Sequence, residues 1–192
     1  HDHRISAVSA IAPQIALMLK VDRLDRFDFS CVKAIVSGGA LAPPELVKAG
    51  RDFFDAPWSI RYSSTESGGV GLGTSLDAND QEALYTVGRP RSGVEASLRD
   101  DGGELVTVGE IGEIWLRSDA IMSCYWNDPH STQETIIEGW LKTGDLAFQD
   151  SRGCFHLVGR TSEMFIRGGY NIFPLEIEKV LSTHKSISEV AL

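Results

Sequence analysis

The chain has 192 residues, of which 42% are hydrophobic, and this is enough apolar content for a globular core. Eighteen basic against 27 acidic side chains give a net charge of -9, so no broad positive surface is available for a nucleic acid backbone. No apolar run approaches the roughly 20 residues that a membrane span needs, and no signal-peptide pattern follows the N-terminus. These features argue against nucleic acid partners and transmembrane segments, and they predict a cytoplasmic protein.

The cysteines Cys31, Cys124 and Cys154 are far apart in the sequence and odd in number. This pattern predicts neither a disulfide framework nor a zinc site, and we expect small buried apolar side chains at these positions. The five histidines are equally scattered, so sequence neighbours alone do not form a metal site.

The first half of the chain has the pattern of a parallel α/β sheet. Apolar residues at helical spacing predict an amphipathic helix over 9–24, and a short apolar run predicts a strand over 32–36 that ends at a glycine turn. After Pro43-Pro44-Glu45, a second helical stretch reaches Phe53 and Phe54, and a brief strand over 59–62 follows. Strands that end in small polar loops are typical of parallel sheets, whose ligands gather at the carboxyl ends of the strands.

The second half has the pattern of an antiparallel sheet or a small barrel. Apolar residues alternate over 94–98 and 114–116 around a turn at 100–103, and a second turn at 150–153 separates two further strands. The expected fold class is therefore α/β plus a small β-barrel.

Beyond Gly159 the sequence predicts a strand, a loop at Gly168-Gly169 and a helix that begins at Pro174. Helical spacing predicts that this helix buries three apolar side chains and exposes Glu178 and Lys179. The three side chains are those of Ile177, Val180 and Leu181. Residues 187–192 have the pattern of a strand that is cut short.

Four short stretches carry side chains that suit a nucleotide. Gly38-Gly39-Ala40 follows a strand, and glycine lets a backbone approach a flat ligand closely. Thr65-Glu66 joins a hydroxyl to a carboxylate, which suits a phosphate and its magnesium ion. Asp145 has acceptors for a ribose diol, and Arg160 has donors for phosphate or ribose oxygens. Taken singly, each has a simpler explanation as a tight turn, a capping residue or an exposed arginine.

The order of these stretches resembles the adenylate-forming superfamily, especially its acyl-CoA synthetases. AIVSGGALAPPEL is similar to the adenine-binding turn of that family, RYSSTE to its Tyr-Gly-x-Thr-Glu motif, and GWLKTGDLA to its ribose-binding motif. GEIWLRSDAIMSCYWNDPHSTQE resembles its barrel motif, and the stretch from Gly159 to Leu181 resembles its hinge and C-terminal motif. Together these stretches cover nearly the whole chain in the order of the family.

The resemblance implies a role for each matching residue. For the adenine ring these are Gly38, Gly39 and Ala40, which would line it, and Tyr62, which would stack on it. For the phosphates they are Thr65, at the α-phosphate, and Glu66, which would hold Mg²⁺. For the ribose hydroxyls they are Asp145 and Arg160. The Gly168-Gly169 loop would move toward the site for thioester formation.

The implied activity is that of an ATP-dependent acyl-CoA synthetase. A carboxylate would attack the α-phosphorus of ATP to give an acyl-adenylate and pyrophosphate, and coenzyme A would then displace AMP. The expected ligands are ATP or AMP, Mg²⁺, coenzyme A and a fatty or aryl acid. An adenylation domain of the peptide-synthetase type and a non-catalytic nucleotide-binding module are the alternatives. The sequence leaves the acid and the oligomeric state open.

Three residues depart from the family pattern: Ser63, Cys124 and Ser162. The phosphate loop and the adenylation lysine of the family are also absent from these residues, so we expect an internal segment that does not complete catalysis alone. Oligomers could form through truncated surfaces. The expected parts are a partial nucleotide-binding subdomain at 1–90, a β subdomain at 91–158, and a hinge with the start of a C-terminal domain at 159–192.

Overall fold

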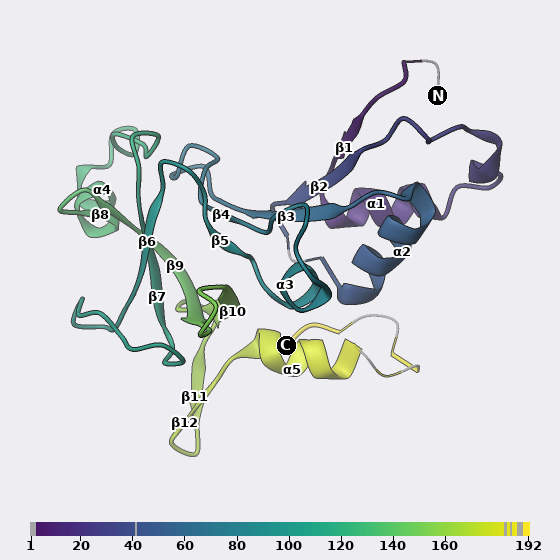
Figure 1. Ribbon diagram of the computed structural model, residues 1–192. Coiled ribbons are helices and arrows are strands. Elements are labelled where there is room, and N and C mark those ends of the chain that lie inside the picture. The colour runs from purple at the N-terminus through teal and green to yellow at the C-terminus, as the bar shows by residue number, and fades with distance from the viewer. Residues whose placement is uncertain (1–2, 41, 183, 185, 188–189) are drawn as a thin grey trace. The chain divides into compact units, whose positions relative to one another are not determined.

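A computed structural model of the chain describes residues 3–40, 42–182, 184, 186–187 and 190–192. Its contacts divide the chain into two compact units, and each of the two five-stranded sheets belongs to one unit (Figure 1). The first unit contains His1–Val94 and Ser118–Met122, and the second contains Glu95–Arg117 and Ser123–Leu192. The predicted fold class, an α/β part followed by an antiparallel β part, is confirmed.

The first unit is built on a five-stranded sheet with the order β1-β2-β3-β4-β5. The parallel strands are β1 (Ala7–Ser9), β2 (Ala34–Gly38) and β3 (Trp58–Tyr62), and β4 (Leu72–Gly73) and β5 (Arg89–Pro90) continue the sheet antiparallel. Strands β2 and β3 were predicted. Strand β1 and the two-residue strands β4 and β5 were not, because elements this short carry no readable periodicity.

The helices of this unit are α1 (Ala12–Leu19), α2 (Pro44–Phe54) and α3 (Asp80–Tyr85), with a single 3-10 turn, η1 (Leu24–Arg26). α2 reaches Phe54, as predicted, and it begins at Pro44, which occupies a first turn where its missing donor costs little. α1 is shorter than predicted at both ends: Ser9 belongs to β1, and the helix ends at Leu19, before the 3-10 turn that begins at Leu24. The unit closes over a core of fully buried side chains that includes Ile15, Ile35, Val47, Trp58 and Leu72.

The second unit is built on an antiparallel sheet with the order β10-β9-β7-β6, and β8 pairs with β9. Its strands are β6 (Glu95–Arg99), β7 (Gly112–Arg117), β8 (Ile136–Ile137), β9 (Trp140–Gln149) and β10 (Phe155–Arg160). Both predicted turns are present, since Gly103 N–H donates to the carbonyl oxygen of Asp100 and Gly153 N–H to that of Asp150, each at 2.9 Å. The helix α4 (Pro129–Thr135), capped by the Asp128 carboxylate, was not predicted.

The last elements are β11 (Phe165–Arg167), β12 (Tyr170–Ile172) and α5 (Pro174–Ser182). The prediction for the buried face of α5 is wrong, because Ile177, Val180 and Leu181 are 38%, 71% and 37% exposed. Amphipathic spacing predicts which face is apolar and does not supply a surface to cover it. The terminal strand is also not found at Ile187 or at 190–192, while residues 188 and 189 lie outside the described part of the chain.

The cysteines differ from one another in exposure. Cys154 is buried, as predicted, whereas Cys31 is half-buried and Cys124 is exposed. Cys124 lies in the connection between β7 and α4, outside any sheet, so its apolar character does not place it in a core. Among the described helices, none combines the length and the apolar composition of a bilayer span.

Candidate functional site

The predicted adenine turn lies beside the carboxyl end of β3. Gly38 is in register with Arg61, and a Cβ atom on Gly38 would stand 2.8 Å from the carbonyl oxygen of Arg61. Gly39 has a φ of +77°, a conformation that favours glycine, and Ala40 is exposed. Tyr62 follows Arg61 at the end of β3 and is half-buried. The structure therefore brings the glycine turn and the tyrosine to the same edge of the parallel strands.

The loop after β3 forms a helical turn that fixes the backbone around Thr65 and Glu66. Ser67 N–H donates to Ser64 Oγ at 3.2 Å, and Ser64 N–H donates to Ser67 Oγ at 3.0 Å. Gly68 N–H donates to the carbonyl oxygen of Thr65 at 3.0 Å. These reciprocal bonds resemble a capping box, which satisfies the free donors at the start of a turn. Thr65 is left exposed and Glu66 half-buried, on a loop held by these hydrogen bonds.

A distant segment of the same unit supports this loop. Met122 N–H donates to the carbonyl oxygen of Glu66 at 2.8 Å. Gly68 has a φ of +66°, and a Cβ atom there would stand 2.1 Å from the carbonyl oxygen of Ala120. Sequence reasoning missed this contact, because nothing in a local pattern indicates that 118–122 returns to the loop.

Glu66 provides a carboxylate and Thr65 a hydroxyl that could serve a magnesium–nucleotide complex. Within the described residues, no cluster of three or more His, Cys, Asp or Glu side chains could hold a metal ion. Mg²⁺ commonly takes one or two carboxylates and completes its coordination with phosphate oxygens and water. The residues present therefore fit an ion that arrives with a nucleotide, and they do not form an independent metal site.

In the second unit, Asp145 and Arg160 are cross-strand neighbours on β9 and β10. Arg160 Nε lies 3.0 Å from Asp145 Oδ1, and the two side chains are 55% and 23% exposed. Thr161 N–H donates to the carbonyl oxygen of Gly144 at 2.9 Å, which ties the end of β10 to β9. An ion pair that is open to solvent on one side offers an acceptor and a donor to the same ligand, such as a diol.

Asp145 lies within a bulge of β9, between Lys142 and Leu146. The pairing of β9 with β7 shifts register between Glu113 and Trp115, and Gly144 has a φ of +73° within the bulge. Glu113 Oε1 accepts the Gly144 N–H at 2.8 Å, and Glu113 Oε2 accepts the Trp115 Nε1–H at 3.3 Å. The Glu113 side chain is 15% exposed, so these donors would have little access to water without it.

Thr143 completes the support of the bulge. Its hydroxyl accepts the Asp145 N–H at 3.1 Å and donates to the carbonyl oxygen of Ile114 at 2.8 Å. Sequence reasoning missed both Glu113 and Thr143 as supporting residues. A Gly-Glu pair before an alternating strand and a threonine before a glycine are too common to indicate such a role.

Gly168 and Gly169 form the two-residue turn between β11 and β12, with φ of +61° and +84°. Paired positive φ values are typical of tight hairpin turns. Both residues are exposed, and no described atom lies within 4 Å of where their Cβ atoms would stand. The structure therefore does not bring this turn against Asp145 or Arg160.

Several known proteins are similar to this chain. A family model described as AMP-binding enzyme matches residues 1–126. A medium/long-chain-fatty-acid–CoA ligase of Mycobacterium tuberculosis is 31% identical over 192 residues, which are 100% of this chain and 34% of that protein. The chain spans about a third of the length of the curated relatives that it matches.

Solved structures are similar over nearly the whole chain. An amide bond synthetase from Marinactinospora thermotolerans is 33% identical with a TM-score of 0.89, over 98% of this chain and 38% of that one. The o-succinylbenzoate CoA synthetase of Bacillus subtilis, in complex with an acyl-adenylate intermediate, is 29% identical with a TM-score of 0.85, over 99% of this chain and 38% of that one. The latter enzyme has also been solved with ATP and a magnesium ion.

Proposed function

We propose that the protein that carries this chain adenylates a carboxylic acid and transfers the acyl group to coenzyme A. The chain belongs to the AMP-binding enzyme family, and the relatives that it matches include acyl-CoA ligases. One observation carries the proposal. The register of β2 and β3 brings the Gly38-Gly39 turn beside the carboxyl end of β3, where Tyr62 and the hydrogen-bonded loop with Thr65 and Glu66 follow. Ligands of open α/β sheets bind at such an edge.

In the first unit, the proposed roles follow from exposure and chemistry. The turn Gly38-Gly39-Ala40 offers a flat backbone surface to adenine, and the Tyr62 ring stacks on the base. The exposed hydroxyl of Thr65 contacts the α-phosphate. Glu66 holds Mg²⁺ together with the phosphates, and the ion would neutralise their charge.

In the second unit, Asp145 accepts hydrogen bonds from the ribose hydroxyls and Arg160 donates to them. Their ion pair at 3.0 Å keeps the two side chains oriented before the nucleotide binds. We also assign the exposed hairpin turn at Gly168-Gly169 to the thioester step, in which it moves toward the site.

The proposed reaction has two steps. A carboxylate oxygen of the acid attacks the α-phosphorus of ATP, the bond to the leaving phosphate breaks, and pyrophosphate departs. The thiolate of coenzyme A then attacks the acyl carbon, and AMP departs with the bonding electrons. In both steps, the residues of this chain position the nucleotide and stabilise charge.

The acceptor has a second candidate. The similarity to an amide bond synthetase supports an amine as the alternative acceptor, which would replace the thiol of coenzyme A. Product analysis by mass spectrometry, with coenzyme A and a panel of amines offered in parallel, distinguishes a thioester from an amide. A cytoplasmic location stays a prediction, which fractionation of cells would test.

Carboxylate-dependent ATP–pyrophosphate exchange tests the first step in the protein that carries this chain. We expect exchange with at least one fatty or aryl acid. Asp145→Asn should lower the exchange rate by about tenfold to a hundredfold, because it removes the negative charge and replaces one of the two acceptor oxygens by an NH₂ donor. Asp52→Asn, at an exposed position of α2, is the matched control and should leave the rate unchanged.

Absence of exchange over the whole acid panel would contradict the proposal and favour a non-catalytic nucleotide-binding module. Exchange that survives Asp145→Asn at the full rate would contradict the role of Asp145 alone.

A further inference from the structure

The first unit contains an open cavity of about 460 Å³ that the proposed function does not use. Residues of β3, β4, α3 and β5 line it. Its volume lies within the range of small-molecule sites. Its charged lining residues are Arg61, Glu82, Arg89 and Arg91. Three guanidinium groups thus face one carboxylate, in a chain whose net charge is -9.

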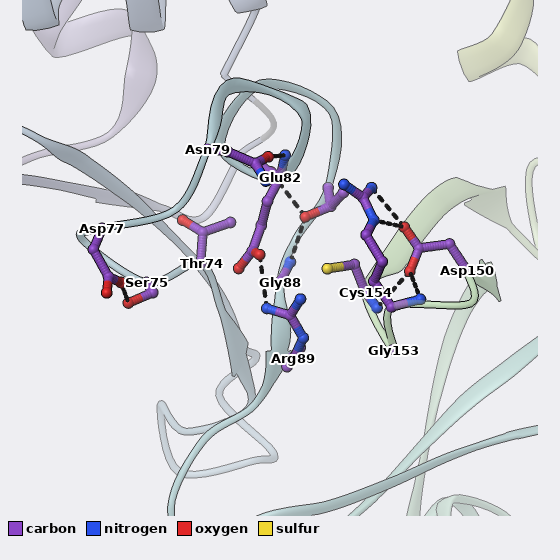
Figure 2. A network of polar contacts seen from close by, with 12 residues as sticks. Thr74, Ser75, Asp77, Asn79, Glu82, Gly88, Arg89, Asp150, Gly153 and Cys154 are labelled. Atoms are coloured by element: carbon purple, nitrogen blue, oxygen red, sulfur yellow. Dashed lines mark hydrogen bonds and ion pairs between the residues drawn. The ribbon is translucent and has the colours of Figure 1, made fainter.

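Glu82 anchors one of the three arginines. Glu82 is only 6% exposed, and its Oε2 accepts a hydrogen bond from Arg89 Nη1 at 2.7 Å (Figure 2). Asn79 Oδ1 caps α3 by accepting the Glu82 N–H at 3.0 Å, which holds the glutamate in place. The other carboxylate oxygen, Oε1, is buried and has no hydrogen-bond partner in the described part of the chain. The positive charge of Arg89 is therefore balanced by the carboxylate of Glu82.

Arg61 and Arg91 have no such partner. Within the described residues, neither forms an ion pair with a carboxylate, and Arg61 Nη1 donates only to the carbonyl oxygen of Thr74, at 3.1 Å. Burial, and then the nearby charge of Arg91, lower the pKa of Arg61 from its ordinary value. Arginine nevertheless stays protonated in proteins, so the two positive charges persist. Neighbouring like charges without a counter-ion repel each other.

We propose that this cavity binds an anionic group, a carboxylate or a phosphate, between Arg61 and Arg91. The guanidinium group is planar and presents its donors in a fork that matches two oxygens of such an anion. Ser92, which also lines the cavity, adds a hydroxyl donor. Two sources of the anion fit this chemistry: a small anion free in solution, or the far end of the acid substrate. The second source rests on the proposed function, and the first does not.

Titration of inorganic phosphate and of succinate into the protein, followed by NMR at the arginine Nε–H signals, tests the site. We expect saturable shifts for Arg61 and Arg91. Arg61→Gln and Arg91→Gln should each weaken binding by about tenfold to a hundredfold, as expected for a lost charge-assisted hydrogen bond. Arg26→Gln, an exposed arginine of η1 in the same unit, is the matched control and should leave binding unchanged.

Arg91 is exposed and forms no hydrogen bond through its side chain within the described residues, so Arg91→Gln keeps the test valid if Arg61→Gln does not fold. Wild-type protein that shows no saturable binding of either anion would overturn the proposal. Binding that survives both substitutions would overturn it as well.

Pyrophosphate exchange in the protein that carries this chain separates the two sources. If the anion is the far end of the substrate, Arg91→Gln raises KM for a dicarboxylic acid about tenfold and leaves KM for the monocarboxylic acid of equal length unchanged. If the anion is free in solution, phosphate still binds and the two acids respond alike. Exchange without any anion binding would overturn this site and leave the proposed function intact.

Discussion

The two units hold their nucleotide-binding candidates by different means. In the first unit the backbone fixes the geometry, because Gly38 and Gly68 stand where a Cβ atom would meet a carbonyl oxygen at 2.8 and 2.1 Å. In the second unit side chains fix it, because Glu113 and Thr143 accept the N–H groups of Gly144 and Asp145. The first region should therefore be sensitive to small increases in volume, and the second to the loss of single polar groups.

Substitution of Gly38 by alanine should have the largest effect. The new methyl group would press on the carbonyl oxygen of Arg61 and separate β2 from β3, so we expect a loss of about 2–3 kcal/mol in the free energy of unfolding. Urea denaturation measures this loss. Gly159→Ala is the matched control, since its Cβ would meet only Phe173, at 3.7 Å, and should change stability by less than about 0.5 kcal/mol. Equal losses in both variants would contradict the steric explanation.

Glu113→Ala should have the next largest effect. It leaves the Gly144 N–H and the Trp115 Nε1–H without their acceptor, which should cost about 1–2 kcal/mol of unfolding free energy and weaken AMP binding severalfold. Thermal unfolding and titration calorimetry with AMP measure the two effects. Glu113→Gln keeps one acceptor oxygen, for the Gly144 N–H, and turns an NH₂ group toward the Trp115 Nε1–H, so it should fall between the wild type and alanine in both measurements. If glutamine were as damaging as alanine, charge and not hydrogen bonding would hold the bulge.

Asp150→Asn should have the smallest effect, and the effect should depend on pH. Burial opposes ionisation of Asp150, but hydrogen bonds from Arg152, the Cys154 backbone and His156 outweigh it and hold the pKa of the carboxyl well below its usual range. A lowered pKa in the folded state means that the ionised form stabilises the fold above the unfolded-state pKa of about 3.9, and that this contribution disappears as the pH falls further.

The wild-type protein should therefore exceed Asp150→Asn in stability by about 1 kcal/mol at neutral pH, with a difference that shrinks below about pH 4. Urea denaturation at several pH values measures it. A difference that grows on acidification would contradict the assignment.

The elements that were predicted correctly are those that short stretches of sequence indicate by themselves. A first-turn proline and helical spacing predicted α2, and alternation around Asp100 and Asp150 predicted the hairpins. The association of Asp145 with a ribose came from family resemblance, since its spacing alone indicates a turn. The capping pattern of Asn79 and Glu82 was visible in the sequence, yet α3 was not predicted, because six residues carry too little periodicity.

The features that escaped prediction are contacts between distant residues. Nothing in the local pattern shows that Ala120 returns to Gly68, or that Glu113 of β7 accepts a hydrogen bond from Gly144 of the neighbouring strand β9. The exposure of the apolar face of α5 was not predicted for a related reason, because periodicity describes one element and not the elements that pack against it. The boundaries predicted near Pro90 and Gly159 stay predictions.

The return of Ser118–Met122 to the first unit has a practical consequence for dissecting the molecule. A polypeptide that stops at Val94 would deprive the Glu66 carbonyl oxygen of the Met122 N–H. Isolating the first unit by cutting the gene once would thus remove part of its own scaffold. A shortened protein that keeps the first unit intact has to join residues 118–122 to Val94 through an artificial linker, because the unit is continuous in space and interrupted in sequence.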